Sequence, residues 1–398
     1  MVIEPKVRGF ICTTAHPAGC KQNVREQIEY VKSKPARPGP LRALILGGST
    51  GYGLASRIAL SYGANADTIS VAYDKPAIGT RTATAGWYNT AAFEQLAHAD
   101  GRYAKSINGD AFSNEIKAQT IDLIRRDLGQ IDVIVYSLAS PVRIDPISGE
   151  RYHSVIKPRG AAFCNKSIDI NTRTVTRAEL EPATDAETAA TVKVMGGEDW
   201  MLWIRALRDA GLLADGVKTV AYSYIGPAVT HPIYRSGTIG AAKLDLERTA
   251  REITETLAPI GGHGYISVNK ALVTQASSAI PVVPLYIGIL YRVMKAHALH
   301  EGCIEQMERL MRTHLLEPEV GLEKDGLIHM DDWEMRPEIQ AEVMRAWDAI
   351  TTENLDEMCD LNGYEDDFYR LFGFRVAGVD YAADVDPAVM IPSLAESC

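Results

Sequence analysis

The 398-residue chain is poor in the features that mark secreted, membrane-spanning and metal-binding proteins. Its six cysteines are scattered, with no Cys-x-x-Cys pair and no nearby ligand histidines. We therefore expect reduced thiols, a cytoplasmic location and no metal site. The N-terminus carries no apolar segment of the kind that secretory signals have. The longest apolar stretch, 279–290, is too short for a membrane span and contains two prolines.

Positive charge is also scarce, because 51 acidic residues outnumber 41 basic ones and the formal net charge is −10. That balance argues against a surface for nucleic acid or anionic membranes, although a local basic pocket can still hold phosphate groups. The remaining composition, 46% hydrophobic and 23% charged, is ordinary for an enzyme with a sizeable core. We expect a monomer.

Residues 42–57 are typical of a strand, a glycine-rich turn and a helix. The apolar run 43–46 stops at Gly47, and Gly51 and Gly53 follow in the spacing G-x3-G-x-G of short-chain dehydrogenases. Glycine permits positive φ and lets a pyrophosphate approach the main chain, while the start of the helix favours phosphate charge. A buried strand-to-helix turn also favours glycine. The turn alone therefore fits both a dinucleotide site and a purely structural turn.

An acidic residue follows the next apolar run. Residues 68–73 end at Asp74, roughly 20 residues beyond the turn, where an acid accepts hydrogen bonds from both ribose hydroxyls of NAD. The same carboxylate repels the 2′-phosphate of NADP. We therefore predict a dinucleotide site that prefers NADH. Lys75 complicates this prediction, because a neighbouring cation partly tolerates a phosphate.

Apolar runs alternate with helical patterns along most of the chain, which predicts an α/β fold. This alternation is typical of a Rossmann-like, doubly wound parallel sheet with helices on both faces. Over 141–191 the alternation of apolar runs and helical patterns stops. Apolar and polar residues alternate on either side of Asn171-Thr172, which predicts an inserted β-hairpin. The other expected strands are 7–16 (with a turn), 103–107, 131–137, 217–224, 264–269 and 374–379; the expected helices are 22–34, 86–99, 114–128, 197–210, 237–257, 285–297, 303–315 and 338–350.

We expect one elaborated domain over 1–398, because the sequence has no internal repeat, low-complexity block or long flexible linker. Within it, the patterns suggest four parts. Residues 41–140 form the first nucleotide-binding half, 141–195 the insertion with the hairpin, 196–300 the second half, and 301–398 the C-terminal helices and the last strand.

A tyrosine and a lysine follow the fifth strand of the predicted sheet. Tyr234 precedes Lys243 by nine positions, which point about 180° apart in a regular helix, so they meet only if Tyr234 lies in the loop before it. Ser236 and Thr238 are candidate N-caps for such a helix. An ammonium beside a phenol lowers the phenol pKa and suits a general acid, so we predict that this pair is catalytic. A chance pairing is the alternative, since the chain has 17 tyrosines.

Longer motifs resemble those of the trans-2-enoyl-CoA reductase and FabV-type enoyl-acyl-carrier-protein reductase family, a branch of the short-chain dehydrogenase superfamily. They cover nearly the whole chain: 7–17, 51–57, 86–89, 108–112, 136–141, 194–200, 273–281 and 300–306. The family's long Tyr-x8-Lys signature falls on Tyr234 and Lys243. Many FabV-type members have two successive lysines there, whereas Leu244 follows Lys243 here. The stretches 222–227 and 234–240 look closer to the CoA-type branch, which puts the carrier-protein assignment in doubt.

The resemblance implies NADH-dependent reduction of the C2=C3 double bond of a trans-2-enoyl thioester, with CoA or acyl carrier protein as the carrier, in fatty acid metabolism. It assigns Tyr234 as the proton donor, Tyr224 as a substrate contact and Lys243 as a cofactor-binding residue. The other cofactor-binding positions that it implies are Gly47, Gly48, Ser49, Thr50, Gly51, Tyr52, Tyr73, Asp74, Asp110, Ala111, Leu138, Ala139, Leu272, Val273 and Thr274.

Some of these features also have a structural interpretation. Asp110 can cap the helix that follows it, and Trp87, Trp200 and Trp203 suit helix packing better than substrate stacking. The apolar segment 285–297 can be core instead of the lining of an acyl channel. Two other functions compete with enoyl reduction. One is a short-chain carbonyl reductase, because the same Tyr/Lys pair protonates an alkoxide; the other is a catalytically silent NADH-sensing module.

Overall fold

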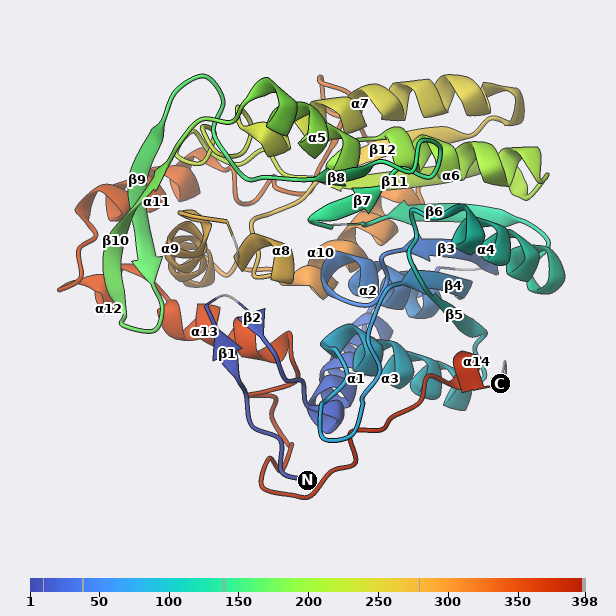
Figure 1. Ribbon diagram of the computed structural model, residues 1–398, viewed down its shortest axis with the longest axis horizontal. Coiled ribbons are helices and arrows are strands. Elements are labelled where there is room, and N and C mark those ends of the chain that lie inside the picture. The colour runs from blue at the N-terminus through green and yellow to red at the C-terminus, as the bar shows by residue number, and fades with distance from the viewer. Residues whose placement is uncertain (10, 38, 139, 279, 396–398) are drawn as a thin grey trace.

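The structure is a computed structural model that describes residues 1–9, 11–37, 39–138, 140–278 and 280–395. A seven-stranded parallel sheet lies at its centre (Figure 1). In sheet order the strands are β13 (Ile328–His329), β12 (His263–Val268), β11 (Leu213–Ser223), β6 (Ile131–Tyr136), β3 (Leu41–Leu46), β4 (Ala66–Ala72) and β5 (Ala104–Asn108). The chain builds this sheet outward from β3 in one direction and then in the other, as doubly wound Rossmann sheets do. The predicted fold class is confirmed.

The middle of the sheet is almost entirely apolar. Residues 43–46 of β3 are 0% exposed, and β6 next to it is buried at every position except Asp132. Strands that are covered on both faces have no solvent side, so they do not alternate polar and apolar residues. This is why the sequence of these two strands reads as continuous apolar runs.

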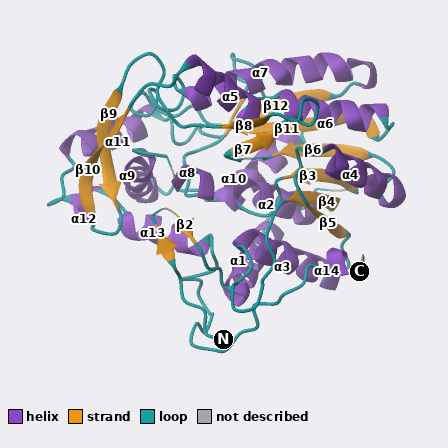
Figure 2. Ribbon diagram, viewed as in Figure 1, coloured by secondary structure: helices purple, strands orange, loops and turns teal. Residues whose placement is uncertain are grey.

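Helices cover both faces of the sheet (Figures 1 and 2). The core on one face contains Trp200 and Trp203, both 0% exposed, which confirms that they are packing residues. Its helices are α4 (Asn114–Asp127), α6 (Glu198–Asp209) and α7 (Thr238–Leu257). The opposite face is covered by α1 (Pro17–Lys32), α2 (Gly51–Ile58), the π-helical turn η1 (Ala59–Gly63), α3 (Ala85–Ala99), α10 (Cys303–Leu310) and η3 (Met311–Leu315).

A third apolar cluster lies beside the sheet, at the left of Figure 1. It is built around α9 (Val283–Ala296), whose side chains from Leu285 to Ile287 are 0% exposed, so the apolar segment is core. Its other members include α11 (Pro337–Ala349), α13 (Leu361–Arg370) and the hairpin β9 (Phe163–Asp169) and β10 (Thr174–Leu180). The hairpin is antiparallel and forms its own two-stranded sheet, which confirms the predicted insertion.

Nine further elements complete the described part of the fold. They are β1 (Val7–Arg8), β2 (Ile11–Cys12), β7 (Val142–Ile144), β8 (Arg151–His153), α5 (Asp185–Met195), the 3-10 turn η2 (Ala258–Ile260), α8 (Gln275–Ser278), α12 (Leu355–Met358) and α14 (Pro392–Ala395). None of the helices in the described ranges combines the length and apolarity that a membrane span needs. The five described cysteines are free thiols.

Helices α1 and α5 differ from the prediction because their caps were not recognised, and helices α8, α12, α13 and α14 were not predicted either. Helix α1 begins at Pro17, five residues before the expected start, since His16 Nδ1 accepts a hydrogen bond from the Gly19 N–H at 3.1 Å. Helix α5 lies in the insertion and was not predicted. It is fixed by a capping box in which Thr184 and Glu187 satisfy each other's backbone N–H groups.

The strand predicted at 374–379 is wrong. Arg375 and Gly378 have φ values of 55° and 76°, which an extended strand does not allow, and this segment is a loop. The seventh strand is instead the two-residue β13, whose Ile328 and His329 pair in parallel with Ser267 and Val268 of β12. A strand this short leaves no alternating pattern that a sequence reading can detect.

Candidate active site

The glycine-rich turn lies where β3 ends beside β6. The Ser137 N–H donates to the Leu46 carbonyl at 2.8 Å, and the Gly47 N–H donates to the Val71 carbonyl at 2.8 Å. Gly47 has φ = 89°, and a β-carbon on it would overlap the Ser137 carbonyl oxygen. Only glycine fits this place. The turn therefore sits at the point where the strand order reverses, where doubly wound sheets bind ligands.

The start of helix α2 is open for a phosphate group. Thr50 is its N-cap residue, and within the described ranges its side chain caps no N–H of the helix. Gly51 has φ = 53°, and the nearest atom to a β-carbon on it would be Thr274 Cγ2 at 3.8 Å. Asn89 Nδ2 fixes the turn by donating to the Ser49 carbonyl at 3.1 Å. Free N–H groups at a helix start bind anions, so residues 47–52 fit a pyrophosphate.

Asp74 stands beside this turn in a fixed orientation. Thr84 Oγ1 donates to Asp74 Oδ1 at 2.7 Å, while the backbone of Asp74 exchanges two hydrogen bonds with the Asn108 side chain. A β-carbon on Gly86 would overlap the same carboxylate. Burial raises the pKa of Asp74, and hydrogen bonds from Thr84 and Ser49 act in the opposite direction. The carboxylate is thus held in one orientation beside the glycine turn.

Tyr73 and Ala111, two of the predicted cofactor-binding positions, differ in exposure. Tyr73 is 76% exposed, whereas Ala111 is buried and its carbonyl accepts from Lys117 and Trp203. The predicted alternative that Asp110 caps α4 is wrong. Ser113 is the N-cap and accepts from the Ile116 N–H at 3.2 Å, while Asp110 Oδ1 accepts from the Phe112 N–H at 3.0 Å.

Leu138 and Ala139 follow β6 at the same edge of the sheet. Leu138 is half-buried, and its Cδ2 would lie 3.3 Å from a β-carbon on Gly47, so it borders the glycine turn directly. Gly48 packs against Ser70 of β4. Ala139 lies outside the described residues.

The segment 272–274 borders the turn from the other half of the sheet. Leu272 and Val273 are buried, and the Val273 N–H donates to Tyr291 Oη at 3.3 Å. Tyr52, in the first turn of α2, donates from its hydroxyl to the Lys270 carbonyl at 2.8 Å. This bond ties the glycine turn to the segment. The structure thus brings the two predicted groups of cofactor residues together.

Tyr234 lies in the turn before α7, as the spacing predicts. Its N–H donates to the carbonyls of Thr230 and His231 at 3.0 and 3.2 Å, and the helix begins at Thr238. The predicted N-caps are wrong, because Gly237 occupies the N-cap position. The Thr238 hydroxyl donates instead to the Val155 carbonyl and so fastens the insertion to the helix.

Lys243 reaches the end of β11 from the second turn of α7. Its Nζ donates to the Tyr222 carbonyl at 2.7 Å, and burial lowers its pKa to about 8. Burial raises the pKa of Tyr234 to about 12. The predicted lowering of the phenol pKa is therefore wrong, because burial disfavours the phenolate and the ammonium bonds to a backbone carbonyl. A phenol with this pKa stays protonated and able to donate.

Tyr224 meets Tyr234 edge to face, with ring centroids 4.7 Å apart and planes at 81°. It follows β11, and Gly226, with φ = 68°, lies so close that a β-carbon there would overlap its ring. Its hydroxyl donates to Glu334 Oε1 at 3.3 Å. Two aromatic rings and a lysine therefore gather at the carboxyl end of the fifth sheet strand.

Four residues that shape the site were not singled out from the sequence. Asn89 and Asn108 lie in motifs that had been noticed, 86–89 and 108–112, so their amides were a usable signal. Thr84 and Glu334 stand alone in the sequence, and only the folded chain brings them to Asp74 and Tyr224.

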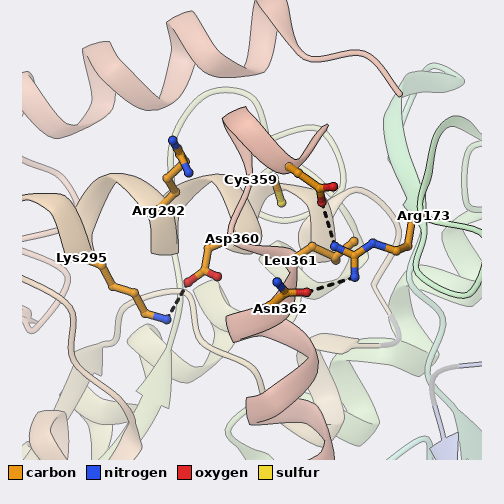
Figure 3. Close-up of a pocket in the computed structure, with 8 residues that line it drawn as sticks. Arg173, Arg292, Lys295, Cys359, Asp360, Leu361 and Asn362 are labelled. Carbon is orange, nitrogen blue, oxygen red and sulfur yellow. Dashed lines mark hydrogen bonds and ion pairs between the residues drawn. The ribbon is translucent and has the colours of Figure 1, made fainter. Parts of the chain in front are cut away.

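A hollow of about 520 Å³ lies apart from these residues, between the hairpin turn, α9, α12 and α13 (Figure 3). Arg173 donates to Asp356 and Asn362, and Lys295 donates to Asp360, so most of its charge is compensated internally. It shares no residue with the glycine turn or the tyrosine pair. The hollow is therefore separate from the site residues predicted from the sequence.

A doubly wound sheet, a glycine turn at its switch point, an acid after the second strand and a Tyr/Lys pair after the fifth are the features of a dinucleotide-dependent oxidoreductase. The model described as the trans-2-enoyl-CoA reductase catalytic region matches residues 81–316, and the NAD(P)H binding domain of trans-2-enoyl-CoA reductase matches 2–79. The chain belongs to the trans-2-enoyl-CoA reductase family.

Relatives and solved structures agree along almost the full length. An enoyl-[acyl-carrier-protein] reductase [NADH] of Flavobacterium johnsoniae is 56% identical over 99% of this chain and 100% of its own. A trans-2-enoyl-CoA reductase [NADH] of Ruminiclostridium cellulolyticum is 53% identical with the same coverage. The crystal structure of Clostridium acetobutulicum trans-2-enoyl-CoA reductase in complex with NADH has a TM-score of 0.95 and 44% identity, over 97% of this chain and 98% of that one.

The Treponema denticola trans-2-enoyl-CoA reductase, solved in complex with NAD, has a TM-score of 0.94 and 46% identity over 98% of this chain and 99% of that one. These comparisons confirm the sequence-based predictions of the family, of an oxidoreductase and of NADH as the cofactor. The observations at the glycine turn and Asp74 agree with that cofactor.

A further model, described as an enoyl reductase FAD binding domain, matches residues 322–385. In these described residues the structure has the two-residue β13 and helices α11, α12 and α13, with no glycine-rich turn between a strand and a helix. The segment therefore lacks a phosphate-binding turn comparable with residues 47–53. It does not fit a dinucleotide in the way the sheet edge does, and we derive no step through a flavin.

Proposed function

We propose that the protein reduces the C2=C3 double bond of trans-2-enoyl thioesters, with Tyr234 as the proton donor. The observation that supports this most is the placing of Tyr234, Tyr224 and Lys243 at the end of β11, two strands from the glycine turn. A substrate in this position lies between the tyrosine pair and the nicotinamide end of the cofactor.

The cofactor residues have separate tasks in this proposal. Residues 47–52 bind the pyrophosphate, Asp74 accepts from the adenosine ribose, and 272–274 border the nicotinamide. Lys243 binds the nicotinamide ribose through its ammonium. NADH, when bound, supplies the hydride that the β-carbon of the enoyl group accepts. The adenine is surrounded by four of the remaining cofactor positions: Tyr73, Asp110, Ala111 and Leu138.

Tyr234 acts on the developing negative charge of the substrate. Addition of hydride at the β-carbon moves charge to the thioester oxygen, which requires a hydrogen-bond donor. The phenol of Tyr234 is protonated at neutral pH, because burial raises its pKa to about 12. It can hold that oxygen and supply the proton, while the ring of Tyr224 limits where the substrate lies.

The proposed activity and two other functions give different results in one assay of NADH oxidation. The proposed reductase oxidises NADH with crotonyl-CoA and not with acetoacetyl-CoA. A carbonyl reductase shows the opposite preference, and a nucleotide-sensing module binds NADH without turnover on either substrate. Initial rates with both substrates, together with NADH binding measured by fluorescence, separate the three.

The acyl group can be carried by CoA or by acyl carrier protein, and the same assay distinguishes the two. Relatives named for the acyl carrier protein and for CoA have similar identities to this chain, 56% and 53%. We propose that CoA thioesters are accepted, because Lys243 is followed by Leu244 and not by a second lysine. Rates on crotonyl-CoA and crotonyl-acyl carrier protein at equal concentrations test this.

We also propose that residues 1–398 form a single elaborated domain, that the enzyme is a monomer and that it works in the cytoplasm. Tyr52 and Cys303 pack against both the apolar cluster beside the sheet and the core on one face of the sheet, which supports the first proposal. Size-exclusion chromatography with light scattering tests the second, and limited proteolysis tests the first.

A further inference from the structure

A buried carboxylate lies directly behind the tyrosine pair. Glu334 follows β13 and is 0% exposed, and none of the sequence motifs includes it. A carboxylate at such depth is stable only if its oxygens are hydrogen-bonded. Its partners are therefore informative about its purpose.

The two oxygens of Glu334 accept hydrogen bonds from different parts of the site. Oε1 accepts from the hydroxyls of Tyr224 at 3.3 Å and Tyr286 at 2.6 Å. Oε2 accepts from the Ala271 N–H at 2.7 Å. One side chain thus connects the tyrosine that faces the substrate with the residue that precedes the cofactor segment 272–274.

The Ala271 peptide is held from both ends by buried charge. The Ala271 N–H donates to Glu334 Oε2, and Nζ of the neighbouring Lys270 donates to the Ala271 carbonyl at 3.1 Å. The Lys270 carbonyl in turn accepts from Tyr52 of the glycine turn. A shift of Glu334 would therefore move the start of the cofactor segment.

The hydroxyls of the two site tyrosines are used differently. The Tyr224 hydroxyl donates to Glu334 Oε1, so its proton is engaged by the protein. Among the described residues no hydrogen bond acts on the pKa of the Tyr234 hydroxyl, so its proton is available. An ionised Glu334 thereby removes Tyr224 from competition for the same thioester oxygen.

We propose that Glu334 is a positioning residue of this enzyme: through Oε1 it fixes the direction of the Tyr224 hydroxyl, so that Tyr234 alone donates, and through Oε2 it holds the cofactor segment. This inference rests on the proposed function. Burial raises the pKa of Glu334, while the Lys270 ammonium and the hydrogen bonds from Tyr286 and Ala271 act in the opposite direction.

The isosteric variant Glu334→Gln reverses the two hydroxyl contacts of Oε1 and preserves the contact to Ala271. Its amide nitrogen donates to the hydroxyls of Tyr224 and Tyr286 and frees the Tyr224 proton, while its amide oxygen still accepts from the Ala271 N–H. We expect kcat with crotonyl-CoA to fall about tenfold, with the Kd for NADH within about twofold of the original. In a Tyr224→Phe background the same substitution should change kcat less than about twofold, because the hydroxyl is gone.

An equal fall of kcat in both backgrounds, or no fall at all, would overturn the inference. Glu94→Gln is the matched control, because Glu94 is also 0% exposed and hydrogen-bonds Ser393, far from the tyrosines. It should lower thermal stability and leave kcat within about twofold of the original.

The contact to Ala271 has its own test. Glu334→Ala removes all three contacts and should raise the Kd for NADH about fivefold in a fluorescence titration; an unchanged Kd in folded protein contradicts this part. Failure of the proposed function is recognised separately, as absence of turnover by the unaltered enzyme. Failure of the inference alone leaves that turnover intact and makes the double-mutant cycle additive.

Discussion

The rings of Tyr224 and Tyr234 meet edge to face, with centroids 4.7 Å apart. Tyr234 belongs to a turn, where a side chain is ordinarily free to change rotamer. The edge-to-face contact and the two backbone bonds of Tyr234 hold its ring beside the end of β11. A proton donor gains from this fixed position, because rate depends on the geometry in which donor and substrate are held.

The first prediction follows from this contact. Tyr224→Leu removes the ring that fixes Tyr234, whereas Tyr224→Phe keeps it. Edge-to-face pairs contribute about 0.5–1.5 kcal/mol, so kcat of the Leu variant should be about three- to tenfold below that of the Phe variant. Steady-state rates at saturating NADH measure this. Equal rates for the two variants would show that the ring contact has no part in turnover.

The second prediction concerns cofactor choice. Asp74 is fixed by Thr84 beside the glycine turn and should repel a 2′-phosphate. Asp74→Ser should lower the ratio of kcat/KM for NADH over NADPH by about tenfold or more. Asp67→Ser, an aspartate at the opposite end of the same strand, should leave the ratio unchanged. Equal kcat/KM for both cofactors in the unaltered enzyme contradicts the assignment.

The third prediction concerns the charge of Lys243. Burial lowers its pKa to about 8, so the ammonium form dominates below that pH and is lost as the pH rises through it. If the ammonium binds the cofactor, the Kd for NADH should rise above about pH 8, by up to about tenfold per pH unit. Lys243→Met should bind weakly at every pH. Lys243→Arg should bind weakly too but without the pH dependence, since its guanidinium stays charged.

Fluorescence titration between about pH 7 and about pH 9.5 measures this dependence. A flat profile for the unaltered enzyme would mean that Lys243 contributes through hydrogen bonding and not through charge. Leu244 beside it is exposed and cannot replace the ammonium.

The fourth prediction separates backbone strain from close contact. Gly47 and Gly211 both have positive φ, 89° and 70°, so alanine at either costs about 1–2 kcal/mol of stability. Only at Gly47 would the added β-carbon overlap a neighbouring segment, at the Ser137 carbonyl just after β6, whereas at Gly211 it would meet no described atom within 4 Å. Gly47→Ala should therefore cost roughly 1–3 kcal/mol more in urea unfolding and weaken NADH binding. Equal costs would show that the turn can relax.

Local pattern in the sequence was enough for the sheet and for its glycine turn. The continuous apolar runs of β3 and β6 could only be strands buried on both sides, and the position of Tyr234 followed from the geometry of a helix. The segment 374–379 shows where local pattern fails. Its Val and Phe residues favour a strand, but the positive φ of Arg375 and Gly378 turns the chain.

The environment of the site depends on contacts between residues far apart in the chain. Glu334 reaches Tyr224 across 110 positions, which no spacing rule reveals. The expected lowering of the Tyr234 pKa failed for a related reason. The sequence places Lys243 near the phenol, but only the folded chain shows that its ammonium bonds to the Tyr222 carbonyl while burial acts on the phenol.

The most direct test of the proposed chemistry is the single-turnover rate of Tyr234→Phe with NADH and crotonyl-CoA, measured where chemistry limits turnover. The phenylalanine keeps the ring against Tyr224 and removes only the hydroxyl. We predict a rate about 10² to 10³ below that of the unaltered enzyme, with the Kd for NADH nearly unchanged. A rate within about threefold of the original would contradict the account and make Tyr224 the donor.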